Sequence, residues 1–274
     1  MKHPAVIPPI NEDRLAAVFK AYDVRGLSPQ EFDEPMARAI GAAFARYTRA
    51  TSIVIGRDMR PSGEGLSAAF AEGVMSQGVD VIDIGLASTD LLYFASGHLA
   101  MPAVMLTASH NPASYNGIKF CHAGAKAIGV ETGLTQIRQF ATEQVSSAGV
   151  RGQTKKIDLL DRFVEHVHSF VDVDALQPLR VVADTANGMG GHVVPATFAG
   201  LPFQLEIIFE ELDGTFPNHP ADPIQPENLV DLQRKVVEVK ADIGLAFDGD
   251  ADRVFLVDEA ANPVSGSLTT ALVA

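Results

Sequence analysis

The sequence predicts an α/β protein with two consecutive α/β/α sandwich domains, each built on a mixed, largely parallel sheet, plus the start of a third domain. Three observations lead to this prediction. Short β-branched runs alternate with amphipathic stretches, as they do in βαβ units. The alternation weakens once, between residues 141 and 157, and then restarts. The length of 274 residues also exceeds that of a domain of typical size.

The first half of the chain contains three short apolar runs and one clear helical pattern. Leu66, Phe70 and Val74 recur at helical spacing after Pro61. Small, polar and charged residues then replace the apolar periodicity between 141 and 157, which fits a linker. We therefore expect a first domain over residues 1–150. Its predicted elements are strands at 52–56, 79–85 and 103–106 and a helix at 61–77.

The second half repeats the alternation and predicts a second domain over residues 151–258. Residues 259–274 read as a turn followed by the first part of a helix, and we expect them to begin a truncated third domain. The predicted elements of the second domain are helices at 158–171 and 226–240 and strands at 180–184, 205–209, 242–247 and 254–257.

Composition excludes several classes of function. The 21 Lys and Arg residues against 34 Asp and Glu residues give a formal charge of −13, which disfavours nucleic-acid and anionic-membrane partners. The single cysteine, Cys121, excludes an intrachain disulfide and a Cys-rich zinc site. No apolar run approaches the ~20 residues of a membrane span, and the N-terminus lacks the apolar core of a signal peptide. We expect a soluble, cytoplasmic protein whose oligomeric state the sequence leaves open.

An acidic turn, 248–253, is the most informative segment. Asp248, Asp250 and Asp252 alternate after an apolar strand, so their side chains can converge on one side. Three anions this close repel one another, and a hard divalent cation, Mg²⁺, is expected among them. An EF-hand loop begins in the same way, but its sixth position must be Gly and is Arg253 here. A solvated acidic turn is the remaining alternative.

A polar loop, 107–112, follows the strand predicted at 103–106, and we expect it to continue to residue 120 and to include Lys119. Ser109 is a poor nucleophile without a base or a metal, and no G-x-S-x-G elbow is present, so an acyl-transfer hydrolase is disfavoured. If Ser109 carries a phosphoryl group, Mg²⁺ on the aspartates can bind one phosphoryl oxygen and Arg253 another. Arg57 is expected to pair with carboxylates and support this loop. An ordinary Asn-Pro turn is the alternative.

Five ordered segments carry a resemblance to a known family. They are Lys20–Gly26, Gly56–Arg60, Thr107–Lys119, Asp213–Leu229 and Asp248–Arg253. Their order and approximate spacing resemble those of the α-D-phosphohexomutases, and most of all the bacterial phosphomannomutase/phosphoglucomutase group. Family members have four domains, of which this chain resembles the first two.

The resemblance implies residue roles. Ser109 would be the phosphoserine, and the acid/base candidates and the groups that stabilise phosphoryl charge would surround it. The implied catalytic residues are Ser109, His110, Lys119, Arg25 and Arg253. The implied Mg²⁺ ligands are Ser109, through its phosphoryl oxygen, Asp248, Asp250 and Asp252.

The reaction implied is the interconversion of hexose 1- and 6-phosphates, of mannose and/or glucose, with a hexose 1,6-bisphosphate as intermediate and activator. The sugar-selecting and phosphate-gripping loops of the family are not found in this sequence, so low turnover is expected. A non-catalytic phosphosugar- or metal-binding module is the alternative. A dinucleotide site at Gly188 and Gly190 is disfavoured, because the third glycine position of that fingerprint is Val193.

Overall fold

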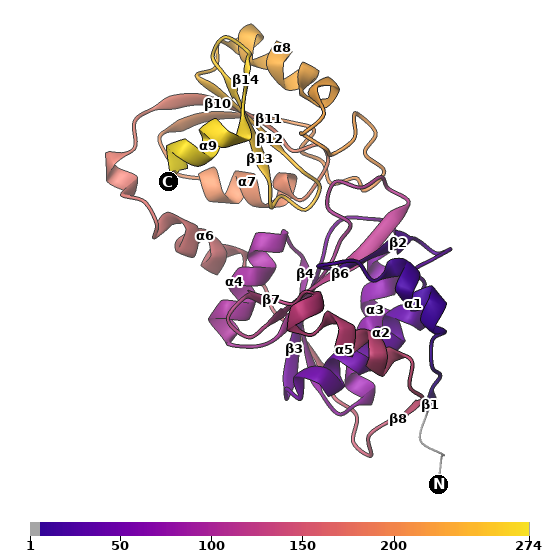
Figure 1. The fold of residues 1–274 in the computed structure, drawn as a ribbon. Helices are drawn as coiled ribbons and strands as arrows, with labels where there is room; N and C mark the ends of the chain where they lie inside the picture. Colours follow the sequence, from indigo (N-terminus) through magenta and orange to yellow (C-terminus); the bar gives the residue numbers. More distant parts are fainter. Residues whose placement is uncertain (1–5, 274) are drawn as a thin grey trace. The chain divides into compact units, whose positions relative to one another are not determined.

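The computed structural model describes residues 6–273, which form two compact units (Figure 1). Residues up to 108 together with 113–159 make the first unit, and residues 109–112 together with 160 onward make the second. Both contain helices on the faces of a mixed sheet, so the predicted fold class is confirmed. Within the described residues, no helix combines the length and apolar character needed to cross a bilayer.

The first unit is built on a seven-stranded sheet with the order β2-β6-β5-β3-β4-β9, to which β7 adds by pairing with β6. Strands β3, β4, β5 and β9 run parallel, whereas β6 is antiparallel to β5, β2 and β7. Buried apolar runs in β3 and β5 are typical of central strands covered on both faces. The bounds are β2 (Val24–Leu27), β3 (Ser52–Arg57), β4 (Asp80–Leu86), β5 (Ala103–Leu106), β6 (Tyr115–His122), β7 (Lys126–Ala127) and β9 (Thr154–Lys156).

Helices cover both faces of this sheet, with α4 on the side opposite α2 and α3 (Figure 1). Helices α2 and α3 approach backbone to backbone because glycines face each other there. A Cβ on Gly41 would lie 2.2 Å from the Phe70 carbonyl oxygen, and one on Gly73 would lie 2.0 Å from that of Arg38. The bounds are α1 (Glu12–Val18), α2 (Glu34–Thr48), α3 (Gly63–Ser76), α4 (Thr89–Leu99), η1 (Val130–Thr132) and α5 (Leu134–Ala141).

The segment predicted as a linker, 141–157, belongs instead to the first unit. Its β8 (Val145–Ser146) pairs with β1 (Val6–Ile7), and β9 extends the main sheet beside β4. The linker prediction was therefore wrong. Strands of two or three residues are too short to show an apolar alternation, and their backbone pairing leaves no trace in the sequence.

The second unit has a five-stranded sheet with the order β11-β10-β12-β13-β14. Strand β10 runs parallel to β11 and β12, and β13 returns antiparallel. Helix α8 packs on a core that includes Val182, Leu232, Val236 and Val257. The bounds are α6 (Leu160–His168), η2 (Val173–Ala175), β10 (Leu179–Asp184), α7 (Gly190–Phe198), β11 (Phe203–Ile208), η3 (Pro226–Leu229), α8 (Val230–Val239), β12 (Ile243–Phe247), β13 (Val254–Asp258), β14 (Pro263–Val264) and α9 (Gly266–Val273).

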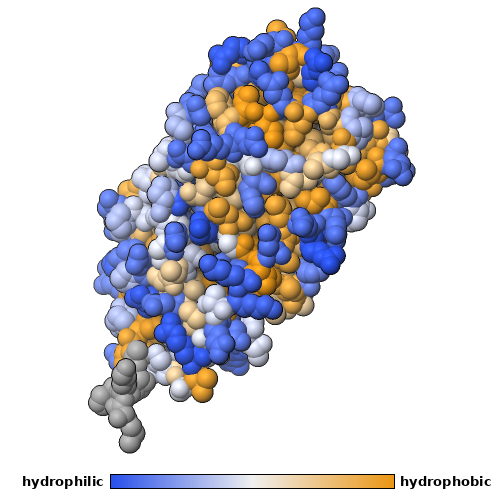
Figure 2. Space-filling view, turned by 180° about the vertical axis from the view of Figure 1, so that it is seen from behind, coloured by the Kyte–Doolittle hydropathy of each residue, from blue (hydrophilic) through white to orange (hydrophobic). Residues whose placement is uncertain are grey.

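Strand β14 pairs with β13 at the edge of this sheet. The expectation that residues 259–274 begin a third domain stays a prediction. Apolar side chains occur among hydrophilic ones on the surface (Figure 2), and the exposed large ones of the second unit include Phe170, Val254, Leu268 and Leu272. Scattered apolar residues are ordinary on protein surfaces and do not by themselves mark a site.

The two units share a strand order that the sequence does not reveal as a repeat. In the first, β4-β3-β5-β6 lie side by side, and in the second, β11-β10-β12-β13 do. In each, the third parallel strand leads through a loop into an antiparallel return strand. The polar loop after β5 and the acidic turn after β12 are therefore equivalent connections.

Candidate functional site

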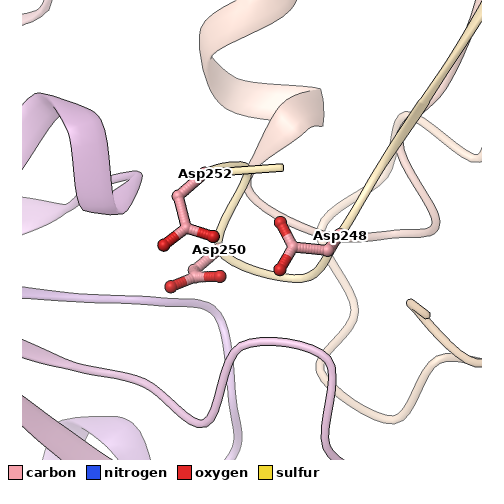
Figure 3. A group of neighbouring side chains, drawn as sticks. All are labelled: Asp248, Asp250 and Asp252. Carbon is pink, nitrogen blue, oxygen red and sulfur yellow. The ribbon is translucent and has the colours of Figure 1, made fainter. Parts of the chain in front are cut away.

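The acidic turn joins β12 to β13 and brings its three carboxylates together. One carboxylate oxygen from each of Asp248, Asp250 and Asp252 lies within 4.8 Å of the others, and Figure 3 shows the three neighbouring side chains on the loop. Asp248 and Asp250 are fully buried, and the Asp252 side chain is partly exposed. The turn closes because Ala251 adopts a left-handed conformation (φ 57°) and its N–H donates to the Asp248 carbonyl.

Ser109 lies against this turn, within the second unit. Its hydroxyl donates to Asp248 Oδ2 (2.7 Å), and Arg253 Nη2 donates to Ser109 Oγ (2.5 Å). The serine is 2% exposed and has a φ of 50°, an uncommon conformation for a residue with a side chain. The hydroxyl is thus held from two sides in a buried position at the end of a parallel strand.

His110 and Arg253 complete the cluster. Arg253 Nη2 donates to His110 Nδ1, and Arg253 Nε donates to Asp248 Oδ2 (3.0 Å). Because a guanidinium can only donate, Nδ1 accepts, and a neutral His110 carries its proton on Nε2. The structure therefore joins four of the predicted residues, Ser109, His110, Asp248 and Arg253, in one hydrogen-bonded group.

Electrostatics in the turn favour a cation. Burial, followed by the nearby charges of Asp250 and Asp252, raises the pKa of Asp248 from 3.8 to about 7, against the opposing effects of Arg253 and the Ser109 hydrogen bond. Carboxylate oxygens at this spacing are the donor set that a hard divalent ion such as Mg²⁺ prefers. The residues present therefore fit the predicted metal.

This raised pKa gives a prediction about stability. The pKa of Asp248 is about 7 in the folded protein, and its ordinary value is 3.8. Between these two pH values the folded protein therefore binds more protons than the unfolded chain does. The free energy of unfolding of the metal-free chain should therefore fall as the pH rises from about 5 to about 7, by up to ~1.4 kcal/mol per unit. Thermal unfolding in EDTA across this range measures the effect. Asp248→Asn should flatten the slope, and an unchanged slope would contradict the assignment.

Gly249, between two of the aspartates, leaves no room for a side chain. A Cβ there would lie 2.4 Å from the Ser109 carbonyl oxygen and 3.5 Å from the Phe216 ring. We expect Gly249→Ala to lower the free energy of unfolding by about 1–3 kcal/mol, as overpacking does, with thermal unfolding followed by circular dichroism as the measurement. Gly266→Ala is the matched control, since a Cβ at Gly266 meets nothing within 4 Å. Equal stability of the two variants would refute the close contact.

Lys119 and Arg25 lie in the first unit. Lys119 is in β6, and its Nζ lies 3.5 Å from Thr89 Oγ1. Arg25 is in β2 and pairs with Asp23 at 2.5 Å. The expectation that Lys119 sits in a loop was wrong, because residues 115–122 form a strand that pairs with both β5 and β2. The roles of Lys119 and Arg25 beside Ser109 stay predictions.

Sequence reasoning missed a buried ion pair that supports both ends of the serine loop. Arg60 Nε donates to Asp58 Oδ2 (3.1 Å), and both side chains are fully buried. Arg60 Nη1 also donates to the carbonyl of Tyr115, where β6 begins, and the Asp58 N–H donates to Leu106, where β5 ends. The prediction for Arg57 was wrong, because Arg57 Nη1 donates to the Asp58 backbone carbonyl (3.4 Å) and Arg60 holds the Asp58 carboxylate.

The glycines of the disfavoured dinucleotide motif have a packing role. The Met189 N–H donates to the Gly249 carbonyl (2.9 Å), and a Cβ on Gly188 would lie 2.8 Å from that same oxygen. The turn between β10 and α7 therefore lies directly against the acidic turn, which explains why a small residue is needed at position 188.

Comparison with known proteins covers nearly the whole chain. Residues 16–156 match the family domain described as phosphoglucomutase/phosphomannomutase, alpha/beta/alpha domain I, and residues 161–262 match domain II. The phosphomannomutase of Salmonella montevideo is 40% identical over 266 residues, which are 93% of this chain and 58% of that protein. The phosphomannomutase of Escherichia coli K12 is 38% identical over 265 residues, with the same coverage.

A solved structure agrees with these matches. The phosphoglucomutase/phosphomannomutase family protein from Burkholderia thailandensis superposes with a TM-score of 0.83 at 34% identity, over 93% of this chain and 56% of that one. The chain thus spans little more than half the length of the relatives it matches.

Proposed function

Because this chain belongs to the phosphoglucomutase/phosphomannomutase family, we propose that it carries the phosphoryl-transfer centre of a phosphohexomutase that interconverts the 1- and 6-phosphates of mannose and/or glucose. The observation that supports this most directly is the hydroxyl of Ser109 held between Asp248 and Arg253.

In the proposed reaction, one phosphoryl group moves from Ser109 to the sugar, and another then moves from the sugar back to Ser109. The free hydroxyl oxygen of a hexose phosphate attacks phosphoserine 109, the Oγ–P bond breaks and a new O–P bond gives the 1,6-bisphosphate. The bisphosphate reorients, Ser109 Oγ attacks its other phosphorus, and the alternate monophosphate leaves. The sugar hydroxyl's proton passes to a base in the first transfer and returns in the second, which balances the exchange.

The contacts of Ser109 explain why a cation is needed. With a free hydroxyl, Ser109 donates a hydrogen bond to Asp248. Phosphorylation replaces that proton with an anionic group beside a carboxylate, and the two would repel each other unless a cation lies between them. We propose that Mg²⁺ is held by Asp248, Asp250, Asp252 and an oxygen of the phosphorylated Ser109. When bound, the metal neutralises charge on the phosphoryl group.

The remaining residues take roles around this centre. Arg253 already donates to Ser109 Oγ and would stabilise the charge that develops on that oxygen as the P–O bond breaks. His110 Nδ1 accepts from Arg253, so a neutral ring carries its proton on Nε2, the nitrogen to which we assign proton exchange. We assign acid/base work to His110 and Lys119 and stabilisation of phosphoryl charge to Arg25.

A second candidate is a non-catalytic phosphosugar- or metal-binding module. It applies to these 274 residues tested by themselves, which cover 58% of the length of the Salmonella montevideo phosphomannomutase, because substrate contacts remote from the reacting atoms support the reacting step. We expect the 274-residue chain to turn over far more slowly than a full-length family member. A coupled mutase assay giving equal kcat/KM would contradict that expectation.

Intact-mass spectrometry separates the two candidates. The chain is incubated with glucose 1,6-bisphosphate or mannose 1,6-bisphosphate and Mg²⁺, with EDTA in a parallel sample. A phosphohexomutase centre gains the mass of one phosphoryl group only when Mg²⁺ is present. No gain with either bisphosphate would refute the proposed function and leave the binding module.

A further inference from the structure

The turn between β10 and α7 holds an unusual backbone conformation. Ala186 and Asn187 are consecutive residues with positive φ, 48° and 57°. Such conformations cost energy for residues with a Cβ and persist only where surrounding contacts hold them. Two side-chain pairs supply these contacts, one at each end of the turn.

The first pair joins Asp184 to His219. Asp184 is the last residue of β10 and is 1% exposed, and its Oδ2 lies 3.0 Å from His219 Nε2. His219 Nδ1 lies 2.9 Å from the Pro220 carbonyl oxygen. A carbonyl and a carboxylate both accept, so only the doubly protonated, charged imidazole can donate to both of them.

The electrostatic balance at His219 agrees with a charged ring. Burial lowers the pKa of His219, but the hydrogen bond and the charge of Asp184 outweigh it, so the pKa lies above its ordinary value. The Phe209 ring meets the imidazole edge to face, with centroids 5.3 Å apart. The imidazole is therefore held in one orientation, and its neighbours favour its charged form.

The second pair joins the amides of Asn218 and Asn187. Asn218 Nδ2 donates to Asn187 Oδ1 (2.8 Å), and Asn187 Nδ2 donates to the Glu211 carbonyl (2.9 Å). The Asp213 N–H also donates to the Asn187 carbonyl (3.0 Å). Residues 213–219 thus hold the turn in its left-handed conformation.

The turn between β10 and α7, held by these two pairs, is itself hydrogen-bonded to the acidic turn. Its Met189 N–H donates to the carbonyl of Gly249, which lies between Asp248 and Asp250. The position that a Cβ on Gly249 would occupy is 3.5 Å from the Phe216 ring, so residues 213–219 also lie beside the acidic turn. No residue of either pair contributes to the three-aspartate cluster itself.

We propose that the His219–Asp184 pair, supported by Asn218–Asn187, positions the acidic turn so that its three carboxylates are set for a divalent cation. His219 is in this view a positioning residue that acts through residues 184–189 and Gly249. The inference rests on the proposed function, since it takes the three aspartates to be the metal ligands.

Mn²⁺ binding to the 274-residue chain tests the inference without an activity assay. Free Mn²⁺ is quantified by electron paramagnetic resonance for the unaltered chain and for His219→Gln, which removes the charge and one donor. Loss of a partner bonded directly to a metal ligand typically weakens metal binding by about 10–100-fold, and we expect about tenfold here, the lower end, because His219 acts through the intervening turn. Asp184→Asn, a smaller change, should weaken binding in the same direction if His219→Gln does not fold.

A matched control separates positioning from general destabilisation. His168 is a half-buried histidine of the same unit whose Nε2 lies 2.7 Å from the Thr197 carbonyl, at the far end of α7. His168→Gln should lower the thermal midpoint but leave the Mn²⁺ affinity unchanged. Equal affinity of His219→Gln and the unaltered chain would overturn the inference alone. Failure of the unaltered chain to bind Mn²⁺ would overturn the proposed metal site and the inference together.

Discussion

Ser109→Ala is expected to abolish the gain of a phosphoryl group from hexose 1,6-bisphosphate completely, because the substitution removes the hydroxyl oxygen that both Asp248 and Arg253 contact. The remaining cluster keeps the Arg253–Asp248 ion pair at 3.0 Å, so the acidic turn retains its main internal contact. Intact-mass spectrometry in the presence of Mg²⁺ measures the loss. The same variant should still bind Mn²⁺, since all three aspartates remain.

Ser114→Ala is the matched control for this experiment. Ser114 lies five residues further along the same loop and is exposed, and its backbone carbonyl, which accepts from the Ser28 N–H, is unaffected by the change. The variant should be phosphorylated at the rate of the unaltered chain. If Ser109→Ala still gains a phosphoryl group, Ser109 is not the acceptor and the proposed mechanism fails.

Arg60→Ala should have the largest effect on stability. Asp58 and Arg60 are both fully buried, so removal of the guanidinium leaves a carboxylate uncompensated in the core. Breaking a buried pair in this way typically costs about 3–5 kcal/mol. Tyrosine fluorescence during chemical denaturation is a selective measurement, because the chain has no Trp and its four Tyr residues all lie in the first unit.

Two further variants make the Arg60 result specific. Arg38→Ala breaks the exposed pair with Glu72, whose side chains are 38% and 47% exposed, and should cost less than about 1 kcal/mol. Arg60→Met combined with Asp58→Asn removes both charges and should restore part of the loss. A midpoint for Arg60→Ala equal to that of Arg38→Ala would show that the buried pair contributes nothing beyond a surface contact.

The sequence predicted the elements and residues whose signal is local. The strand at 103–106 has the predicted bounds, and the other predicted strands and helices are found with ends shifted by a few residues. The alternation of Asp248, Asp250 and Asp252 predicted three converging carboxylates, and the structure gathers them. Apolar periodicity and spacing carry such information because they depend on neighbours in the chain.

What depended on distant partners was not predictable. Strand β9 was taken for a linker because its pairing partner, β4, lies about seventy residues earlier. Lys119 was placed in a loop because the strand around it gains its hydrogen bonds from β2 and β5. The pair His219–Asp184 joins residues 35 positions apart, and neither alone signals a partner. Backbone pairing and buried charge are decided by tertiary contacts, which a single sequence does not report.

The equivalent positions of the two polar loops have a consequence for how such a centre can change over time. Each loop connects two neighbouring strands of its own sheet. The backbone pairing of those strands does not depend on the side chains of the loop. The loop after β5 carries the hydroxyl of Ser109, and the turn after β12 carries the three carboxylates. Substitutions in either loop can therefore change its side chains while the sheet beneath stays intact, and under the proposed function the same strand arrangement, used twice, presents both the hydroxyl and the carboxylates.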